Sequence, residues 1–520
     1  MLELLPVQSI YRDRPFFNDF VCGRGEALTF LENASRSDPF VPEQVPRAVG
    51  EDGFRSALHR HNLDLGAGAA TLANIEALAS PRTLCVLTGQ QPGILGGPLY
   101  TAYKIMTAIR TARQLADRLA VRAVPIYWLA SQDHDINEVN QLQWLDKRGA
   151  VTTARFRWHQ EGRRFDALPI TDDALEIMTR YFDDVAGGDD TSDRIRSVFA
   201  PAAEDSFCSW HARIWLRLFT VHGLVIADPC TLPPPTSFYR TALREHQEIR
   251  DRVSQQCLRL QAAGYPSPFP SGSAGGLFAQ DDHGKRVRVA DPDQSARDLA
   301  DHPLDFSPDA AMRPVLADRW FPTAVNILGP GEISYHAALG TLYPMFGLQQ
   351  PPAAFRLSLS VLSAADRALI QDVGVSIEEA VSRGLRARDA GWHFAPNSLR
   401  EVWQSMRETI QESLDTVGAE ARRIDPGLER PVGTARGGVS HALERLEQRI
   451  LRAILAKRGV SPARLSALTT LLAPKDRPQE RILSLPELLV RHGAWLTDRM
   501  LELEPWPIDC HAVMTVDEPS

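Results

Sequence analysis

Residues 84–104 are LCVLTGQQPGILGGPLYTAYK, and this stretch decides the class of fold. Its first five residues form a short apolar run bounded by Gly89, which is typical of a buried strand. After Pro98, a residue that suits the first turn of a helix, apolar side chains recur at helical spacing, at Ile105, Ile109, Ala112, Leu115 and Leu119. A second apolar run, VPIYWLA, occupies residues 124–130. Strand, helix and strand in this order predict a βαβ unit, and therefore a parallel sheet.

The alternation of strands and helices continues downstream. A helix is expected over 209–220 and leads into a strand at 224–228. A further strand at 323–328 runs into a Gly-Pro-Gly-Glu turn and then a helix through Leu342. The Pro- and Gly-rich stretch 264–277 predicts a loop or an inserted hairpin, and the first 80 residues are expected to be helical and irregular. The pattern indicates an α/β protein with a nucleotide-binding type of core.

The last third of the chain has a different pattern. Residues 398–421 and 439–457 each carry one apolar helical face, and glycines and prolines lie between them. This pattern predicts two antiparallel helices joined by a loose tip. Another apolar helix is expected over 483–503. We therefore expect a catalytic core over 1–375 with insertions at 145–300, a helical coiled-coil arm over 376–473, and a segment over 474–520 that packs back on the core.

Composition excludes several classes of protein. The 520 residues suggest two to four structural units, and the formal charge of −8 gives no basic face for nucleic acid. The 6 cysteines form no CxxC pair, so we expect reduced thiols rather than disulfides or a structural zinc site. The N-terminal sequence does not resemble a signal peptide, and no apolar stretch is long enough to span a membrane. These features favour a cytoplasmic protein.

The glycine-rich loop after the first strand is the strongest local signal. Glycines let a ligand approach the backbone closely, and free N–H groups at a helix start favour an anion. The loop matches neither a Walker A sequence nor GxGxxG. The alternative is a tight turn in which glycines serve packing. The candidate binding residues here are Thr88, Gly89, Gln90, Gln91, Gly93, Gly96, Tyr100 and Lys104.

An acidic segment follows the second strand. In an open parallel sheet, ligands bind beyond the carboxyl ends of the strands, so this segment and the glycine loop are expected to meet. Its carboxylates could bind an ammonium group, hold Mg²⁺ together with ATP phosphates, or act as a general base. The alternative is an acidic helix cap. A zinc site is disfavoured because one histidine stands alone. The candidates are Asp133, His134 and Asp135 for catalysis, and Glu138 and Asn140 for binding.

A third candidate segment, GPGEISYH, occupies residues 329–336 after another predicted strand. Its alternative is a plain turn and helix start. Three arginines nearby, Arg313, Arg319 and Arg356, are basic groups that the sequence does not rank. The candidate binding residues are Gly329, Gly331, Glu332 and Tyr335.

Four segments together resemble a known family, the bacillithiol biosynthesis cysteine-adding enzymes. They are TGQQPGILGGPLYTAYK at 88–104, VPIYWLASQDHDINEVN at 124–140, FSPDAAMRPVLADRWFPTAVNILGPGEISYHA at 306–337 and QERILSLPELLVRHG at 479–493. They occur in the same order and with similar spacing, whereas residues 140–300 match only loosely. One departure is Gln132, at a position where the family usually carries an acidic residue before Asp-His-Asp.

The resemblance implies a Rossmann-like core with connecting-peptide insertions, and a coiled-coil arm that pairs two subunits. The implied reaction joins L-cysteine to the amine of glucosaminyl-malate and gives bacillithiol. Because amide formation in water is uphill, the cysteine carboxyl must be activated, and adenylation by ATP, with Mg²⁺ as a companion of the nucleotide, is the expected route. The glycine loop and the GPGE turn would donate N–H groups to phosphate or malate, and Asp133, His134 or Asp135 would take the proton from the attacking amine.

Two other functions remain open at the level of sequence. One is a different class I ligase or nucleotidyl transferase that adds another amino acid to another amine. The other is a non-catalytic dimeric scaffold whose arm binds a partner. The clustering of polar residues at three predicted strand ends favours an enzyme, and the arm's apolar faces could also pack on the chain's own core.

Overall fold

The computed structural model describes residues 1–31, 53–185, 190–503 and 509–517. At its centre lies a five-stranded sheet of order β11-β10-β2-β3-β6, in which every neighbouring pair is parallel. The predicted βαβ unit is confirmed, because β2 and β3 pair along their whole length and α4 connects them. The bounds are β2 Leu84–Gln90, α4 Leu99–Leu119, β3 Ala123–Leu129, β6 Val225–Ala227, β10 Thr323–Leu328 and β11 Ala353–Phe355.

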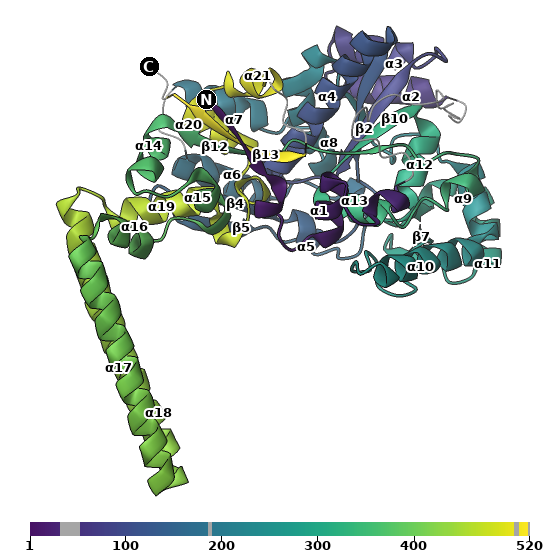
Figure 1. Cartoon of the computed structure of the whole chain (residues 1–520). Coiled ribbons are helices and arrows are strands. Elements are labelled where there is room, and N and C mark those ends of the chain that lie inside the picture. Colours follow the sequence, from purple (N-terminus) through teal and green to yellow (C-terminus); the bar gives the residue numbers. More distant parts are fainter. Residues whose placement is uncertain (32–52, 186–189, 504–508, 518–520) are drawn as a thin grey trace.

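Helices cover both faces of this sheet (Figure 1). One face packs against α4 through an apolar cluster that includes Val86, Ala112 and Ile327. The other face belongs to a larger cluster with residues from α1 (Pro15–Cys22), α2 (Phe54–Asp64), α3 (Ala69–Ala77) and α12 (Met312–Trp320). Strands buried on both faces must be apolar almost continuously, which is why the runs at 84–88 and 124–130 were recognisable in the sequence.

The order of the strands creates a crevice at one place. From β2 the chain moves to β3 and β6 on one side, and later returns to β10 and β11 on the other. The direction of the connections therefore reverses between β2 and β10, whose residues Leu87 and Asn326 lie side by side. In open parallel sheets, ligands bind beyond the strand ends at such a reversal.

Two insertions extend the sheet's connections. Between β3 and β6 lie α5 Ile136–Val139, β4 Gln141–Leu145, β5 Val151–Arg155, α6 Asp172–Val185, α7 Asp190–Phe199 and α8 Phe207–Phe219. Between β6 and β10 lie α9 Thr236–Arg244, α10 His246–Ala262, β7 Leu277–Gln280, β8 Arg286–Arg288, α11 Pro292–Asp301 and β9 Ser307–Pro308. The expected loop at 264–277 leads into the antiparallel pair of β7 and β8.

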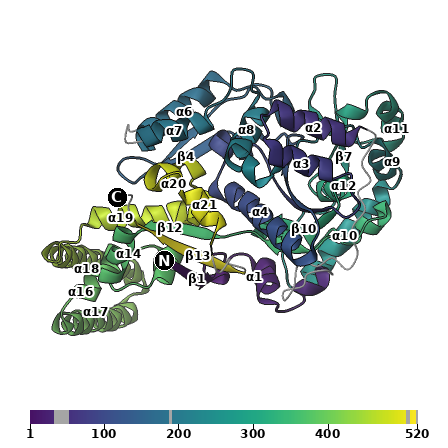
Figure 2. The same cartoon turned by 90° about the horizontal axis from the view of Figure 1, so that it is seen from above.

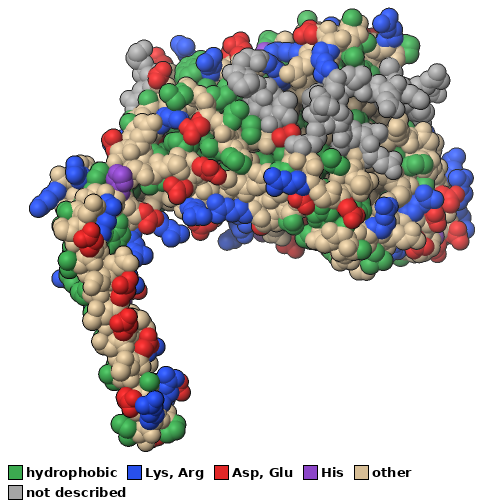
Figure 3. Space-filling view, viewed as in Figure 1, with side chains coloured by type: hydrophobic (Ala, Val, Ile, Leu, Met, Phe, Trp, Pro, Cys, Tyr) green, Lys and Arg blue, Asp and Glu red, His purple; other side chains and the backbone are tan. Residues whose placement is uncertain are grey.

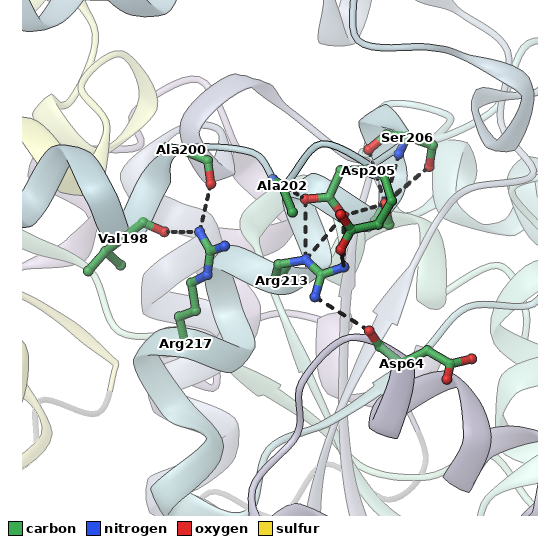
Figure 4. A network of polar contacts seen from close by, with 10 residues as sticks. Asp64, Val198, Ala200, Ala202, Asp205, Ser206, Arg213 and Arg217 are labelled. Carbon is green, nitrogen blue, oxygen red and sulfur yellow. Dashed lines mark hydrogen bonds and ion pairs between the residues drawn. The ribbon is translucent and has the colours of Figure 1, made fainter.

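One polar network ties the first insertion to the core (Figure 4). Arg213 on α8 donates from Nε to Asp205 Oδ1 at 3.1 Å and from Nη1 to the main-chain oxygen of Asp64, in the last turn of α2, at 3.4 Å. The Asp205 side chain is fully buried. Arg217, one turn after Arg213 on α8, is exposed. Within the described residues it donates hydrogen bonds to main-chain oxygens only, among them those of Val198 and Ala200.

Replacing Arg213 by leucine is expected to lower the free energy of unfolding by about 3 kcal/mol, because the buried Asp205 carboxylate would lose its countercharge. Arg217→Leu is the matched control on the same helix, and it should cost less than about 1 kcal/mol because no buried charge is left behind. Urea unfolding followed by circular dichroism measures both. Equal losses for the two variants would contradict this account of the network.

A second, small sheet joins the two ends of the chain. Its order is β1-β13-β12, with β1 Leu2–Pro6 antiparallel and β12 Leu359–Ser363 parallel to β13 Cys510–Val516. The expectation of a helical and irregular N-terminus is therefore wrong for the first strand, although α1, α2 and α3 are helical. The five residues of β1 show no usable alternation, and their partner lies at the other end of the sequence. The part of that expectation on residues 32–52 lies outside the described residues.

The predicted helix at 483–503 is also wrong as a single element. The structure has two helices, α20 Leu485–His492 and α21 Leu496–Leu501. They are separated at Gly493, which adopts a φ of +96°, a left-handed value that a glycine tolerates and a helix interior does not. Both helices pack on the core, where the Leu99 N–H donates to the Leu483 main-chain oxygen at 2.8 Å.

α13 Pro330–His336 connects β10 to β11 in the core. The remaining helices form the C-terminal part, and they are α14 Ala364–Asp372, α15 Ile377–Arg383, α16 Ala387–Phe394, α17 Asn397–Ile424, α18 Glu429–Lys457 and α19 Pro462–Leu472. Short 3-10 turns occur at Val7–Ser9, Ala27–Phe30, Ile94–Gly96, Phe165–Ala167, Thr220–His222, Pro303–Asp305, Tyr343–Phe346, Pro426–Leu428, Pro474–Asp476 and Gln479–Arg481. The antiparallel helices α17 and α18 project from the body as an arm (Figure 1), and Figure 2 shows them beside α14 and α16, away from the central sheet.

The tip of the arm is shorter than predicted. α18 begins at Glu429 and includes Pro431, Gly433, Gly437 and Gly438, which were expected in a loose connection. Proline is tolerated in the first turn of a helix. A side chain at any of the three glycines would meet nothing within 4 Å, so no close contact requires glycine there. Each glycine destabilises the helix by about 1 kcal/mol relative to alanine. Packing against α17 offsets that cost.

Apolar side chains remain on the surface of the arm, as Figure 3 shows along its length. Val402, Val417, Ile424 and Leu446 are large and exposed, and Ile424 retains 81% of its accessible surface. Only a few arm residues, such as Trp403, Leu451 and Leu455, are buried. In the described part of the chain, no helix combines the length and the apolar character that crossing a membrane requires.

Candidate active site

A cavity of about 800 Å³ lies where the direction of the connections reverses, beyond the ends of β2 and β10. Three segments that are far apart in the sequence contribute to its wall, as the three motifs suggested. The predicted residues that line it are Thr88, Gly89, Gln90, Gln91, Tyr100, Lys104, Asp133, Asp135, Glu138, Gly329, Gly331, Glu332 and Tyr335. Four predicted residues do not line it, namely Gly93, Gly96, His134 and Asn140.

Two glycines of the loop serve packing, which is the plainer of the two interpretations made from the sequence. The Gly93 N–H donates to His211 Nδ1 on α8 at 3.0 Å. Gly96 has a φ of +84°, and a side chain there would lie 2.8 Å from the Trp215 ring. Gly93 and Gly96 therefore allow the loop to pack closely on α8. Of the three loop glycines predicted to bind a ligand, Gly89 is the one that lines the cavity.

Lys104 ties the first and third segments together. Its side chain is buried, and Nζ donates to the Gly89 main-chain oxygen at 2.8 Å, to Gln90 Oε1 at 2.8 Å and to Glu332 Oε2 at 2.6 Å. Burial lowers the pKa of Lys104, and the facing Glu332 carboxylate opposes that shift. Glu332 also accepts the Gly329 N–H at 2.7 Å, so this amide, expected to bind an anion, already has a partner.

The negative charge of Asp133 is balanced by neighbouring arginine side chains. Its Oδ2 lies 3.1 Å from Arg313 Nη2 and accepts a hydrogen bond from Gln91 at 3.0 Å, and Oδ1 lies 3.7 Å from Arg286 Nη1. Burial alone would raise the pKa of Asp133, but these arginines and the hydrogen bonds from His134 and Gln91 hold it well below its usual range. A carboxylate held in this way is a poor general base.

His134 and Asn140 have structural partners outside the cavity. His134 Nδ1 lies 3.0 Å from Arg286 Nη1, and its ring packs beside Phe278. Asn140 Nδ2 donates to the Phe156 main-chain oxygen at 3.3 Å. Gln132, the departure from the family pattern, is buried and does not reach the cavity wall.

The two other acidic residues differ from each other. Asp135 is exposed and caps α5, where Oδ1 accepts the Asn137 N–H at 3.1 Å, so the helix-cap interpretation applies to it. Glu138 is also exposed, but it accepts a hydrogen bond from Gln91, which bridges it to Asp133. Burial raises the pKa of Glu138, and the negative charges of Asp133 and Asp135 add to the shift. Of the predicted carboxylates, Glu138 is the best suited to take up a proton.

The part of the cavity wall around Tyr100 carries cations that the sequence did not rank. Arg356 and Arg481 each place a guanidinium 5.7 Å from the centre of the Tyr100 ring. Arg356 is buried and is held by Glu480 at 2.7 Å and by the Tyr11 hydroxyl at 3.0 Å, whereas its Nε has no partner in the described part of the chain. Arg481 comes from the C-terminal segment and could have been noticed only within the QERILS motif. Arg319 lies elsewhere and donates to Ser237.

Among the described residues, no three His, Cys, Asp or Glu side chains lie close enough together to hold a metal ion. The groups that line the cavity include amides, carboxylates and cations. It has an acidic rim at 133–138 and a cationic wall around Tyr100. Such an arrangement suits a ligand that carries both an amine and anionic groups.

The comparisons with known proteins agree with one another. Residues 7–357 match the family model described as the bacillithiol biosynthesis BshC N-terminal Rossmann-like domain. Residues 360–515 match the C-terminal coiled-coil domain of the same family. A relative from Geobacillus thermodenitrificans, named "Putative cysteine ligase BshC", is 29% identical over 472 residues, which cover 86% of this chain and 87% of the relative.

Two further relatives carry the same name. The protein of Anoxybacillus flavithermus is 28% identical over 488 residues, covering 88% of this chain and 90% of the relative. That of Bacillus licheniformis is 24% identical over 524 residues, covering 95% and 96%. The similarity extends over nearly the whole of each chain, the arm included.

Proposed function

This chain belongs to the bacillithiol biosynthesis BshC family, and from that premise we propose that it is a ligase that joins L-cysteine to the amine of glucosaminyl-malate. One observation carries the proposal beyond the family name. One cavity is lined both by Glu138, a carboxylate with a raised pKa, and by cations, among them Lys104, Arg356 and Arg481. Amide formation between an amine and a carboxylate needs both kinds of group.

The cationic wall would hold the anionic parts of the substrates. Arg481 has no ion pair among the described residues, and the Arg356 Nε–H has no acceptor. Guanidinium groups bind carboxylates and phosphates through charge-assisted hydrogen bonds. The malate carboxylates of the acceptor substrate are groups of this kind.

A nucleotide also fits the residues present. The unpartnered Nε of the buried Arg356 and the free Arg481 guanidinium are donors suited to phosphate, and the volume admits a nucleotide beside a small substrate. ATP bound here would supply the activation of the cysteine carboxyl. Arg356 and Arg481 would hold its charge, with Mg²⁺ as a companion of the phosphates.

The chain's own contribution to the bond-forming step is proton transfer and positioning. The amine nitrogen of glucosaminyl-malate would attack the activated cysteine carboxyl carbon and form the C–N bond. The C–O bond to the activating phosphate group would break, and that group would leave as an anion, with its electron pair, toward Arg356 and Arg481. The proton that the nitrogen loses would pass to Glu138. Gln91 holds Glu138 in place from the glycine loop, and Asp133 holds Gln91. The six cysteines are free thiols, and none is required as a nucleophile. Free thiols suit a reducing cytoplasm, where we place the enzyme.

The test is an assay of purified protein with ATP, L-cysteine and glucosaminyl-malate, with mass spectrometry of the products. We expect bacillithiol to form only when all three substrates are present. Omission of ATP, or its replacement by α,β-methylene-ATP, whose bridge between the α- and β-phosphates cannot be cleaved, should abolish the product. Folded protein that yields no bacillithiol with any nucleoside triphosphate would overturn the proposed reaction.

We also infer that two subunits pair through the arm. Its exposed apolar side chains, among them Val402 and Val417, are more than two antiparallel helices need for their own contact. Light scattering with size-exclusion chromatography is expected to give a dimer for the wild-type chain, and a monomer after Val402→Glu with Val417→Glu. The control is Thr416→Glu, at an exposed polar position, which should remain dimeric. A monomeric wild-type chain at micromolar concentration would contradict the inference.

A further inference from the structure

Asn326 lies on the floor of the cavity, in the middle of the central sheet. It is on β10, in register with Leu87 of β2, and both residues line the cavity. Its side chain is buried, with 3% of the residue exposed. Nδ2 donates to Asp318 Oδ2 at 3.0 Å and lies 3.3 Å from Oδ1.

Asp318 fixes which end of the Asn326 amide faces the cavity. The reverse orientation would place the amide oxygen against a carboxylate, which repels it. Asp318 is itself held on α12, because the Tyr343 hydroxyl donates to Oδ2 at 2.7 Å. Asn326 Oδ1 accepts no hydrogen bond from the described residues, and it is not fully shielded from solvent. The amide therefore presents an acceptor to the cavity.

Two further neutral side chains line the cavity. Each has a polar atom, His336 Nδ1 and Trp128 Nε1, that is buried without a partner among the described residues. Burial, with the charge of Lys104, lowers the pKa of His336 to about 3, so the ring is neutral. The Trp128 N–H can only donate a hydrogen bond, and the neutral His336 ring can donate or accept one. The Asn326 amide oxygen can only accept, so it suits an N–H group of a ligand.

We propose that Asn326 is a specificity-determining residue that accepts a hydrogen bond from an amino group of the ligand, and that Asp318 is a positioning residue that fixes the amide. The inference rests on the proposed function, which supplies two sources of such a group. One is the α-amino group of L-cysteine, and the other is the exocyclic amine of the adenine base. The shared chemistry is an N–H donor.

Protonation of Asp318 gives the arrangement a dependence on pH. Burial raises the pKa of Asp318 to about 6, against hydrogen bonds from Tyr343, Thr323 and Asn326, and no charged group contributes. Above pH 6 the carboxylate accepts from Asn326 and keeps its oxygen toward the cavity. Below pH 6 the carboxyl carries a proton to donate, the amide is free to turn, and affinity for an N–H donor falls.

Isothermal titration calorimetry on the purified full chain tests the inference with two pairs of probes. L-cysteine is compared with 3-mercaptopropionate, which lacks the amine, and ATP with ITP, which lacks the exocyclic amine. Asn326→Leu is expected to weaken one amine-bearing probe by about tenfold and to leave its amine-free partner unchanged. If the affinity falls for L-cysteine, the N–H donor is its α-amino group. If it falls for ATP, the donor is the exocyclic amine of the adenine base. Ile327→Val, on the same strand but with its side chain in the apolar cluster that faces α4 and not in the cavity wall, is the control and should bind as wild type.

Other outcomes also decide the matter. Unchanged affinity for both amine-bearing probes, or equal weakening of each probe and its amine-free partner, overturns the inference. Should Asn326→Leu fail to fold, Asp318→Asn decides instead. Asparagine keeps the shape of the Asp318 side chain but does not titrate, so the affinity of this variant for the amine-bearing probe should no longer fall below pH 6. A pH profile identical to that of the wild type would contradict the positioning role of Asp318. A wild-type chain that binds neither L-cysteine nor ATP overturns the proposed function and this inference with it.

Discussion

Replacing Glu138 by glutamine is expected to lower kcat by about 10²- to 10⁴-fold, the usual contribution of a general base, with little change in KM. Glutamine keeps the size of the side chain and its hydrogen bond with Gln91, but it cannot take up the amine proton. The basic form of Glu138 exists above its pKa, which burial raises. Wild-type activity should therefore fall as the pH decreases through that value, and the variant should lose this limb of its pH profile.

Asp135→Asn is the comparison that makes this result specific. Asparagine caps a helix as well as aspartate does, so activity should change less than about threefold. Steady-state kinetics of both variants between pH 5 and pH 9 provide the measurement. If Asp135→Asn were the more damaging change, the assignment of the base to Glu138 would be wrong.

Replacing Asp133 by asparagine is expected to lower the free energy of unfolding by about 3 kcal/mol, because it leaves the buried Arg286 and the nearby Arg313 without their shared countercharge. Activity should fall as well, since Gln91 and Glu138 lose their support. The pKa of Asp133 is held low, so its stabilising contribution is present above the ordinary carboxyl pKa. It is lost only as the pH falls through the depressed value.

The double variant Asp133→Asn with Arg313→Gln separates a structural role from amine binding. It restores the charge balance and should recover part of the lost stability in urea unfolding. If Asp133 instead binds the substrate amine, Asp133→Asn would raise KM strongly at unchanged stability. That result would return Asp133 to the role that the sequence suggested.

The sequence predicted the core and the position of the site for one physical reason. Strands buried on both faces must be apolar, and the carboxyl ends of parallel strands gather at one edge. The segments after Thr88, Ala130 and Leu328 therefore had to meet, and they line one cavity. The same logic indicated the arm, because two amphipathic helices in succession favour an antiparallel pair.

The individual roles of the residues were beyond the sequence. Asp133 looked like a base because nothing in the sequence shows that Arg286 and Arg313, from other segments, lie against it. Arg481 reaches the cavity only because the C-terminal segment packs on α4. Strand β1 was missed because a short edge strand has little pattern and its partner is distant. The glycines of α18 suggested a loop because local propensity was weighed without the packing of α17.

A crystal structure of the chain with L-cysteine and ATP tests the central claim most directly, that three separated segments form one active-site cavity. We predict that the ligands lie between Gln91 and Glu138 on one side and Lys104, Arg356 and Arg481 on the other, with an amino group within hydrogen-bonding distance of Glu138 or Asn326. Ligands bound elsewhere, with the cavity between residues 88–91 and 329–332 filled only by solvent, would contradict the account.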